Sequence, residues 1–545
     1  QNDDLSFGFG FEHADESFAS GGDTVPFPVL LSSFMEQGDD SRFRRLLRVL
    51  ISNAQLNVKN SKQASLFDAQ NLNIELLHNK GGEVTVNNSA TIHYKDYSTN
   101  IVAKFSMSNE QPDISGWVEF SELMPDVLAG LFYDNADIKS FSVPISGKVN
   151  MEFDKKGSAK DIGFNIFGNK GSITSSRLAG SLPITSLRVK GNVKDNFKAL
   201  DIEALSLNMD GMKLEGGVQA NFFDDSTESD VSPEIKAAII MTDIPSDMVN
   251  ILWPPAVSSM SREWVTTSIS GGKVPEAKLV VQIKKGDLKL PVLPKEAIKA
   301  ELKVEDLNIL YLPEHPPAKH VKGNIHIDGV SLSADIESAD YLEKTKLTNG
   351  HVIIDDLNAD NPYINVDLNA DAPAKDMVHF LGLPRLKKAE RLNLRENEVK
   401  GNVKGFAKVG FNFFAPQGQN AEDAIVYDVK AEVSGVSQDK FLNKFDIVNA
   451  NGTVSVDNNG VEFSGVGEIN GAVVSKSNVK YLFSPEKGLD TFIEVVAKSD
   501  IANLKRFGYP EFPFMKNGSI GVNAKVRLGD KLEYSEGKLD LSDAE

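Results

Sequence analysis

Histidine and acidic side chains are the groups in this 545-residue chain that could bind a metal ion or transfer protons. Among the eight histidines, His315 and His320 lie closest together, in and just after a Pro-rich segment, and none belongs to a His-Glu-x-x-His motif. The acidic run from Asp355 to Asp360 lacks the glycine and terminal glutamate of an EF-hand calcium loop. We therefore predict a polar turn at this run and no metal site.

Motifs for covalent or phosphate chemistry are also missing from the sequence. It contains no Gly-x-Ser-x-Gly elbow, no Gly-Lys-Ser/Thr phosphate loop and no cysteine, which excludes thiol catalysis and disulfides. A carboxylate pair for glycoside hydrolysis remains an open alternative in so acidic a chain. However, three tryptophans against 31 phenylalanines suit a dry surface better than a sugar-binding cleft. We predict that the protein is not an enzyme and needs no cofactor.

The charge balance narrows the choice of partners. The chain has 58 Lys+Arg against 77 Asp+Glu, a net charge of -19, which argues against a nucleic-acid partner. A hydrophobic fraction of 41% is ordinary for a folded protein, yet no apolar run approaches the roughly 18 residues of a membrane-spanning helix. We predict a folded chain without a transmembrane helix of its own.

Apolar and polar residues alternate along most of the chain, and this alternation is typical of strands with one dry face. The clearest runs are Ile235–Met241, Leu279–Ile283, Leu332–Ile336, Tyr363–Ala370, Tyr427–Val433, Thr453–Val456 and Ser519–Val526. Turn residues separate such runs at Asp210-Gly211, Asp328-Gly329 and Asn458-Asn459-Gly460, which indicates hairpins. The sequence therefore predicts a mainly β protein built as a long antiparallel meander.

A motif containing Asp recurs along this meander at a nearly constant period. The Asp residues are 126, 247, 376 and 500, at spacings of 121, 129 and 124 residues. Each copy predicts a strand end, a short capped helix and then a Gly-x-Val/Ile strand start. A fixed period of this kind indicates stacked repeats. We predict an N-terminal β-groove segment with a helical start at 1–125, then repeats at 126–246, 247–375 (containing Trp253-Pro254-Pro255) and 376–499, and a partial repeat at 500–545.

About one short helix in every 125 residues is too little to cover the dry face of so many strands. We therefore expect the sheet to curl into a long trough, a β-groove, whose apolar lining is open to acyl chains. The residues predicted to line it are the apolar members of the alternating runs: Ile239, Met241, Leu279, Val281, Ile283, Ile325, Ile327, Leu332, Ile336, Ile364, Val366, Leu368, Val429, Val433, Val454, Val456, Val461, Phe463, Ile493, Val495, Ile520 and Val522.

Three segments depart from the strand pattern. Phe27–Met35 and Arg42–Ile51 are each predicted to form a helix, the second with arginines around an apolar stripe. A basic amphipathic helix can lie on an anionic membrane, but a helix that covers the sheet end is the interpretation we prefer. The basic stretch Arg385–Arg395 is predicted to be an exposed linker between repeats.

One segment resembles a known protein family. Trp253-Pro254, then Arg262-Glu263-Trp264-Val265, then Gly271-Gly272-Lys273-Val274 is similar to the signature of AsmA-like proteins related to YhdP and TamB. The close resemblance covers about 24 residues, whereas the looser pattern of strands and interspersed helices extends over nearly the whole chain. It implies a repeating β-groove that transfers phospholipids between the inner and outer membranes of a bacterium.

The resemblance also implies where the protein works. Family members are anchored in the inner membrane by an N-terminal helix that this chain does not show, so we expect a periplasmic excerpt that binds phospholipids and contacts outer-membrane or other envelope proteins. The alternative is a structural or adhesive β-repeat whose apolar face is a filled core. Lipid bound to the purified protein would distinguish these two hypotheses.

Overall fold

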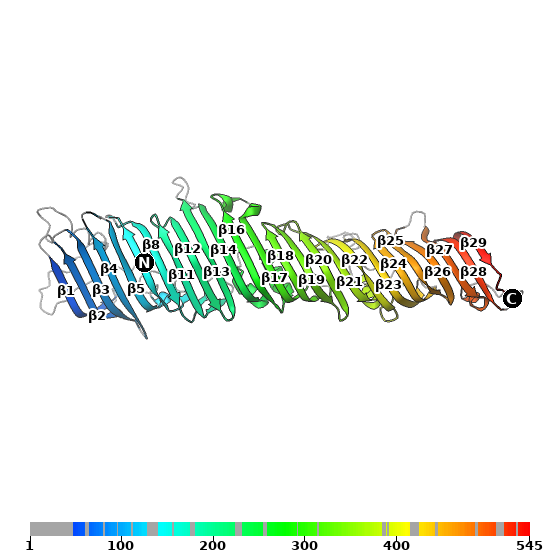
Figure 1. Cartoon of the computed structure of the whole chain (residues 1–545), viewed down its shortest axis with the longest axis horizontal. Helices are drawn as coiled ribbons and strands as arrows, with labels where there is room; N and C mark the ends of the chain where they lie inside the picture. Colours follow the sequence, from blue (N-terminus) through cyan, green and yellow to red (C-terminus); the bar gives the residue numbers. More distant parts are fainter. Residues whose placement is uncertain are drawn as a thin grey trace. The chain divides into compact units, whose positions relative to one another are not determined.

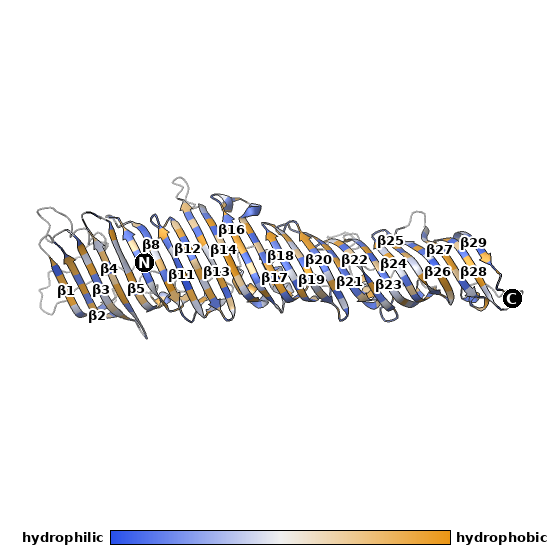
Figure 2. Ribbon diagram, in the orientation of Figure 1, coloured by the Kyte–Doolittle hydropathy of each residue, from blue (hydrophilic) through white to orange (hydrophobic). Residues whose placement is uncertain are grey.

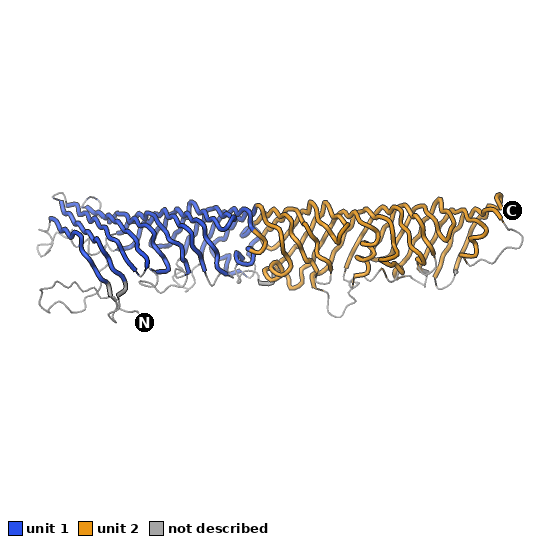
Figure 3. The backbone as a smooth tube through the Cα atoms, turned by 90° about the horizontal axis from the view of Figure 1, so that it is seen from below, with its two compact units in different colours: residues 1–244, 248–257, 276–299 blue, residues 245–247, 258–275, 300–545 orange. Residues whose placement is uncertain are grey.

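A computed structural model describes residues 47–59, 65–79, 82–94, 96–108, 110, 113–127, 140–154, 157–174, 180–223, 232–253, 259–290, 293–312, 315–383, 389, 392–414, 425–441, 445–484, 489–507, 517–529 and 532–544. These residues divide into two compact units. Unit 1 comprises 1–244, 248–257 and 276–299, and unit 2 comprises 245–247, 258–275 and 300–545, within the described ranges (Figure 3). Each unit is a stack of antiparallel strands.

The strands of the first half are β1 (Arg48–Lys59), β2 (Ser65–His78), β3 (Val84–Tyr94), β4 (Tyr97–Met107), β5 (Ile114–Leu123), β7 (Ile145–Phe153), β8 (Ala159–Gly168), β11 (Ser186–Lys194), β12 (Ala199–Met209), β13 (Met212–Phe223), β14 (Ser232–Pro245) and β16 (Lys273–Ile283). Three short strands, β6 (Phe141–Ser142), β9 (Gly171–Thr174) and β10 (Ser181–Ile184), pair separately with one another. Consecutive strands of the main sheet lie side by side (Figure 1).

The remaining strands are β15 (Ile269–Ser270), β17 (Ile298–Ile309), β18 (Ala318–Asp328), β19 (Ser331–Tyr341), β20 (Thr345–Ile354), β21 (Tyr363–Pro373), β22 (Lys400–Asn412), β23 (Ile425–Phe441), β24 (Phe445–Asp457), β25 (Gly460–Ile469), β26 (Ala472–Leu482), β27 (Leu489–Asp500), β28 (Ser519–Gly529) and β29 (Leu532–Asp540). Hydrogen bonds join them and the strands above into a 26-stranded sheet. The prediction of a mainly β, antiparallel meander is confirmed.

Helical segments are few among the described residues. They are η1 (Ser246–Met248), α4 (Val249–Leu252), α5 (Ser259–Ser268), η2 (Asp287–Lys289), η3 (Lys295–Ala297), α6 (Ala374–Leu381), η6 (Ile501–Phe507) and a helical turn at 125–127. All four Asp-containing segments of the predicted repeat therefore lead from a strand into a short helical segment. The division into repeats between these points stays a prediction.

Alternation along each strand gives the sheet one apolar face and one polar face. Figure 2 shows apolar and hydrophilic residues alternating along the strands. On the polar face, charged side chains of neighbouring strands pair across the sheet, as Lys190 does with Glu203 at 2.6 Å and Lys525 with Glu494 at 2.9 Å. These exposed pairs explain why lysines and acidic residues are interspersed in the sequence. We use the term apolar face for the other side in each unit.

In unit 1, the strand registers align the apolar residues into rows that cross many strands. One row contains Ile202 of β12, Gly191 of β11, Phe164 of β8, Val149 of β7 and Val118 of β5. Position 191 has no room for a side chain, since an added Cβ would clash with the Asp201 carbonyl oxygen of β12 and would meet the Phe164 ring at 3.0 Å. Glycine therefore allows β12 and the Phe164 ring to approach the backbone of β11 closely.

The hairpin predictions are confirmed, and one turn shows why. Asp210-Gly211 joins β12 to β13, and both residues adopt positive φ, 40° and 92°. Positive φ at both central positions is the twist-matched geometry of a two-residue hairpin, and aspartate and glycine tolerate it best. Asp328-Gly329 lies at the turn between β18 and β19, with Gly329 at a φ of 62°, and Asn458-Asn459 lies between β24 and β25.

The predicted helical start at Arg42–Ile51 is wrong where the structure describes it, because β1 begins at Arg48. Val49 pairs with Leu76, and Ile51 pairs with Ile74, so these residues extend the apolar face. β-Branched side chains such as these favour strands, and the available partner β2 decides the choice. The predicted helix Phe27–Met35 and residues 42–46 lie outside the described residues.

Candidate lipid-binding face

Each predicted lipid-facing residue of unit 1 lies on the less exposed side of its strand. Ile239 and Met241 of β14 stand opposite Gly216 and Leu214 of β13, in rows of apolar residues. In β16 the predicted positions are buried or half-buried while the neighbouring positions 278, 280 and 282 are exposed. These β16 positions are Leu279, Val281 and Ile283.

In unit 2, the registers bring all the remaining predicted residues onto the apolar face. The pairs include Ile327 with Leu332, Ile364 with Phe411, Val429 with Val456, Val454 with Phe463, Val495 with Ala524 and Val522 with Ala497. Residues directly opposite each other in an antiparallel pair point to the same side of the sheet. The structure therefore gathers side chains up to about 200 positions apart in the sequence on one surface.

Most of these side chains are only partly covered by the protein. Among all the predicted residues, only Ile283, at 9% exposure, and Ile520, at 4%, are buried, and the others are half-buried. A closed protein core covers its large apolar side chains almost completely. The apolar face thus retains surface that an apolar ligand could cover.

Much of the apolar face in unit 1 is not predicted by the alternation in the sequence. The missed residues include Phe105, Met107, Ile114, Val118, Phe120, Val149, Phe164, Ile166, Leu187, Val189, Leu205 and Leu207. Glycines at apolar-face positions, such as Gly116 and Gly147, interrupt the hydrophobic alternation and make these runs look polar. Strict period-two counting that treats glycine as neutral would have found them.

Part of the apolar face in unit 2 is covered by the protein itself. Leu312, which follows β17, packs with Phe411, Ile425 and Tyr427 in a buried cluster, and Tyr311 and Phe380 pack against this cluster. Edge-to-face ring contacts connect the covering residues. The ring centroid of His315 lies 5.3 Å from that of Tyr311 and 6.1 Å from that of Phe380. We call Tyr311, Leu312, His315 and Phe380 the aromatic cap.

The helix that carries Phe380 is tied to the sheet by a buried hydrogen bond. Thr345 Oγ1 donates to Asp376 Oδ2 at 2.8 Å, and the two residues are 1% and 5% exposed. Thr345 begins β20, and Asp376 lies in the first turn of α6, where a carboxylate is favoured by the helix dipole. The repeated Asp at this position therefore positions the helix over the apolar face.

The segment after α6 differs from the prediction of an exposed linker at Arg385–Arg395. Its described part includes Ala389 and Leu392, each 5% exposed, and Ala389 packs with Val378 of α6 in a second buried cluster. Leu394 packs against that cluster. The apolar residues between the basic ones explain why this segment is buried, because they pack on a part of the sheet face that would otherwise be uncovered.

Tyr341 contacts the cap and has a strongly perturbed phenol group. It is 4% exposed, and its ring lies 6.2 Å from Phe380, edge to face. Burial raises the pKa of Tyr341 to about 12, and the negative charges of Asp376 and Glu396 act in the same direction. Since the folded pKa exceeds the unfolded value of about 10, this group stabilises the fold below pH 10, and its contribution is lost as the pH rises through 12.

We expect the titration of Tyr341 to be visible by absorbance. The absorbance of phenolate at 295 nm is measured against pH for the native chain and for Tyr341→Phe, and the second curve is subtracted from the first. The other nine tyrosines contribute equally to both curves, so the difference reports Tyr341 alone and should have its midpoint near pH 12. In urea the same difference should have a midpoint near pH 10. A native midpoint near 10 would show that the phenol is solvated.

A comparison with protein-family models matches residues 45–543 of the chain to the YhdP protein family. The chain belongs to the YhdP family. This confirms the resemblance drawn from the Trp-Pro and Arg-x-Trp-Val segments and places the chain in a family of bacterial envelope proteins. Comparisons with curated proteins and with solved structures gave no match.

One tryptophan of this YhdP-family signature, Trp264, lies beside the end of β22, the strand that carries Phe411. Trp264 of α5 contacts Phe413, which follows β22, with ring centroids 6.1 Å apart. The backbone N–H of Leu310 donates to the Ser268 carbonyl oxygen at 2.8 Å, so the end of α5 also holds the start of the segment that carries Tyr311. Trp264 and the end of α5 therefore contact the segments that flank the covered part of the apolar face in unit 2.

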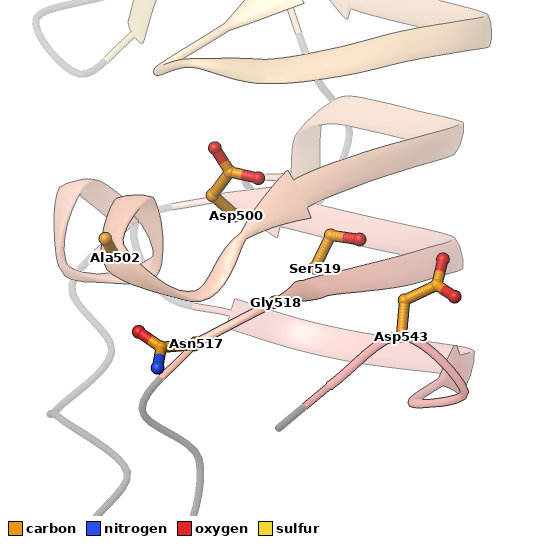
Figure 4. Close-up of a pocket in the computed structure, with 6 residues that line it drawn as sticks. All are labelled: Asp500, Ala502, Asn517, Gly518, Ser519 and Asp543. Carbon is orange, nitrogen blue, oxygen red and sulfur yellow. The ribbon is translucent and has the colours of Figure 1, made fainter.

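The described residues also form a polar pocket of about 370 Å³ near the last strand. Figure 4 shows Asp500 at the end of β27, Ala502 in η6, Asn517, Gly518 and Ser519 before and in β28, and Asp543 after β29. Lys498 pairs with Asp543 at 2.5 Å, and Ser519 N–H donates to the Asp543 carbonyl oxygen at 3.0 Å. These contacts hold strand ends together.

Within the part of the chain that is described, no helix is long and apolar enough to cross a bilayer.

Proposed function

We propose that this YhdP-family protein binds phospholipids through the apolar face and carries their acyl chains along it within the bacterial envelope. The observation that supports this most strongly is the register: half-exposed apolar side chains follow one another across consecutive strands in each unit. Acyl chains would lie on this face, and the headgroups would remain in water at its margins.

The free energy of burying acyl chains on the apolar face is consistent with a lipid carrier. Each methylene group removed from water contributes about 0.8 kcal/mol, so two acyl chains are held firmly in total. Because the rows are lined by similar valine, isoleucine, leucine and phenylalanine side chains, a shift along the sheet exchanges one apolar contact for another. The barrier to movement is then small compared with the free energy of release into water.

We also infer that the protein acts in the periplasm, anchored in the inner membrane and in contact with outer-membrane or other envelope proteins. We assign no catalytic residue, cofactor or nucleic-acid partner to the chain. Family membership supports the envelope setting.

Mass spectrometry of organic extracts from the purified chain is the direct test. We expect one or more phospholipids per chain, and a delipidated sample re-exposed to vesicles should regain them. A delipidated sample that stays lipid-free although its circular dichroism is that of a β protein would contradict the proposal.

A filled-core structural repeat is the second candidate function. The observation that favours it is the pair of buried clusters over β21–β24, where α6 and the aromatic cap cover the apolar face. Absence of lipid from the extracts would support this candidate.

A further inference from the structure

The aromatic cap occupies a position on the apolar face that an acyl chain would otherwise take. Leu312 belongs to the buried cluster with Phe411, Ile425 and Tyr427, and Tyr311 and Phe380 pack against this cluster. The same cluster is packed against the strand residues Ile364, Val366, Val409 and Val456, which the registers place on the apolar face of unit 2. By contrast, Ile493 and Val495 of β27 on the same face are half-buried and lie outside this cluster. A lipid moving along the face of unit 2 therefore meets the cap.

Two segments far apart in the sequence build the cap, and neither is a strand. Tyr311, Leu312 and His315 lie between β17 and β18, and Phe380 lies in α6 between β21 and β22. His315 connects them, because its ring contacts both Tyr311 and Phe380, and its Nδ1 lies 3.2 Å from the Tyr311 hydroxyl. His315 is thus one link between the two halves of the cap, beside Tyr341, whose ring also contacts Phe380.

Leu312, Tyr311 and Phe380 meet the buried cluster through apolar side-chain contacts, whereas the hydrogen bond from Thr345 to Asp376 holds α6 itself. The backbone N–H of His315 donates to the Leu312 carbonyl oxygen at 3.1 Å, which is a bond within the segment itself. Apolar contacts are not directional, so an acyl chain can replace them with contacts of similar strength. Displacement of these side chains by a lipid, with α6 still held through Asp376, then costs much less than the opening of a strand pair would.

We propose that the aromatic cap is a gate: it closes the apolar face over β21–β24, and its two halves separate when a phospholipid passes. This inference rests on the proposed lipid-carrying function and adds a control point to it. The gate makes passage depend on how well the lipid competes for Phe411, Ile425 and Tyr427, the buried residues beneath the cap.

The absence of cysteine allows the cap to be closed covalently. In the variant His315→Cys/Phe380→Cys, a short bifunctional methanethiosulfonate reagent would bridge the two halves, and a reductant would release them. A matched control is Ser464→Cys/Asn478→Cys, because these residues are directly opposite on the polar face of β25 and β26. The control pair carries the same bridge without crossing the apolar face.

A photo-crosslinking residue, benzoylphenylalanine, reports where the lipid lies. It would replace Phe411 beneath the cap, Phe120 on the apolar face of unit 1, or Phe492 on the polar face, each in the full chain. Delipidated protein is incubated with vesicles of phosphatidylethanolamine and phosphatidylglycerol, irradiated, and analysed for lipid adducts by mass spectrometry. Phe492 gives the background level.

If the cap is a gate, bridging it should lower adducts at Phe411 at least tenfold, reductant should restore them, and adducts at Phe120 should not change. The control bridge should leave both positions unchanged. Two results would overturn the gate and leave lipid binding intact. In both, adducts form at Phe120. In the first, Phe411 is labelled equally in the bridged and reduced states, and in the second it is labelled in neither state. Background labelling at Phe120 as well would overturn the lipid-carrying function itself.

Discussion

Replacement of Val495 by aspartate is expected to reduce phospholipid transfer between vesicles by at least tenfold. Val495 lies on the apolar face of β27, opposite Ser477 and Ala524, and is half-buried. An acyl chain that passes a carboxylate must remove its water, which costs several kcal/mol without a compensating hydrogen bond, and each 1.4 kcal/mol is a factor of ten in rate. The measurement is the rate of labelled-lipid transfer from donor to acceptor vesicles by the purified chain.

The neighbouring residue supplies the control. Val496 is on the polar face of the same strand, opposite Lys476 and Asn523, and is 37% exposed. Val496→Asp introduces the same charge into the same strand, so both variants carry a similar cost in strand propensity. Both should keep the native circular dichroism. Equal transfer rates for the two variants would exclude the apolar face of unit 2 as the lipid path.

Replacement of Thr345 by valine is expected to destabilise the attachment of α6 by about 2 kcal/mol. The change removes the donor to Asp376 but keeps the shape of the side chain, and it leaves the buried carboxylate without this hydrogen bond. Hydrogen exchange at the amides of Val378–Leu381 measures the local effect. A loss of 2 kcal/mol corresponds to an acceleration of about 30-fold.

Thr348 on the same strand is the matched control. It is exposed, and Thr348→Val should leave exchange in α6 unchanged, because valine and threonine are both good strand residues. Unchanged exchange in Thr345→Val would mean that packing of Val378 and Ala389 alone holds the helix. The bond to the repeated Asp would then have no measurable part in covering the apolar face.

Local patterns in the sequence were sufficient to predict the strands and the side of the sheet on which their alternating apolar residues lie. Alternation in Tyr363–Ala370 predicts both the strand and the side that Ile364 and Val366 occupy, because successive side chains in a strand must point to opposite sides. Asp210-Gly211 predicts its hairpin because few residue pairs tolerate positive φ twice. The same local logic failed where apolar-face positions are glycine, as at Gly116, since glycine carries no hydropathy signal of its own.

The sequence by itself thus determined that this YhdP-family chain is an antiparallel meander, which residues face the apolar side where the alternation is unbroken, and where short helices follow the strands. Only the tertiary structure decided that Arg48–Ile51 is a strand, that the apolar residues among the basic ones after α6 are buried, and that Leu312 and Phe380 cover the face. The physical reason is sequence separation: Leu312 packs on Phe411 and Ile425, about 100 positions away. Contacts of this kind depend on which surface the folded sheet leaves uncovered, and no local period encodes them.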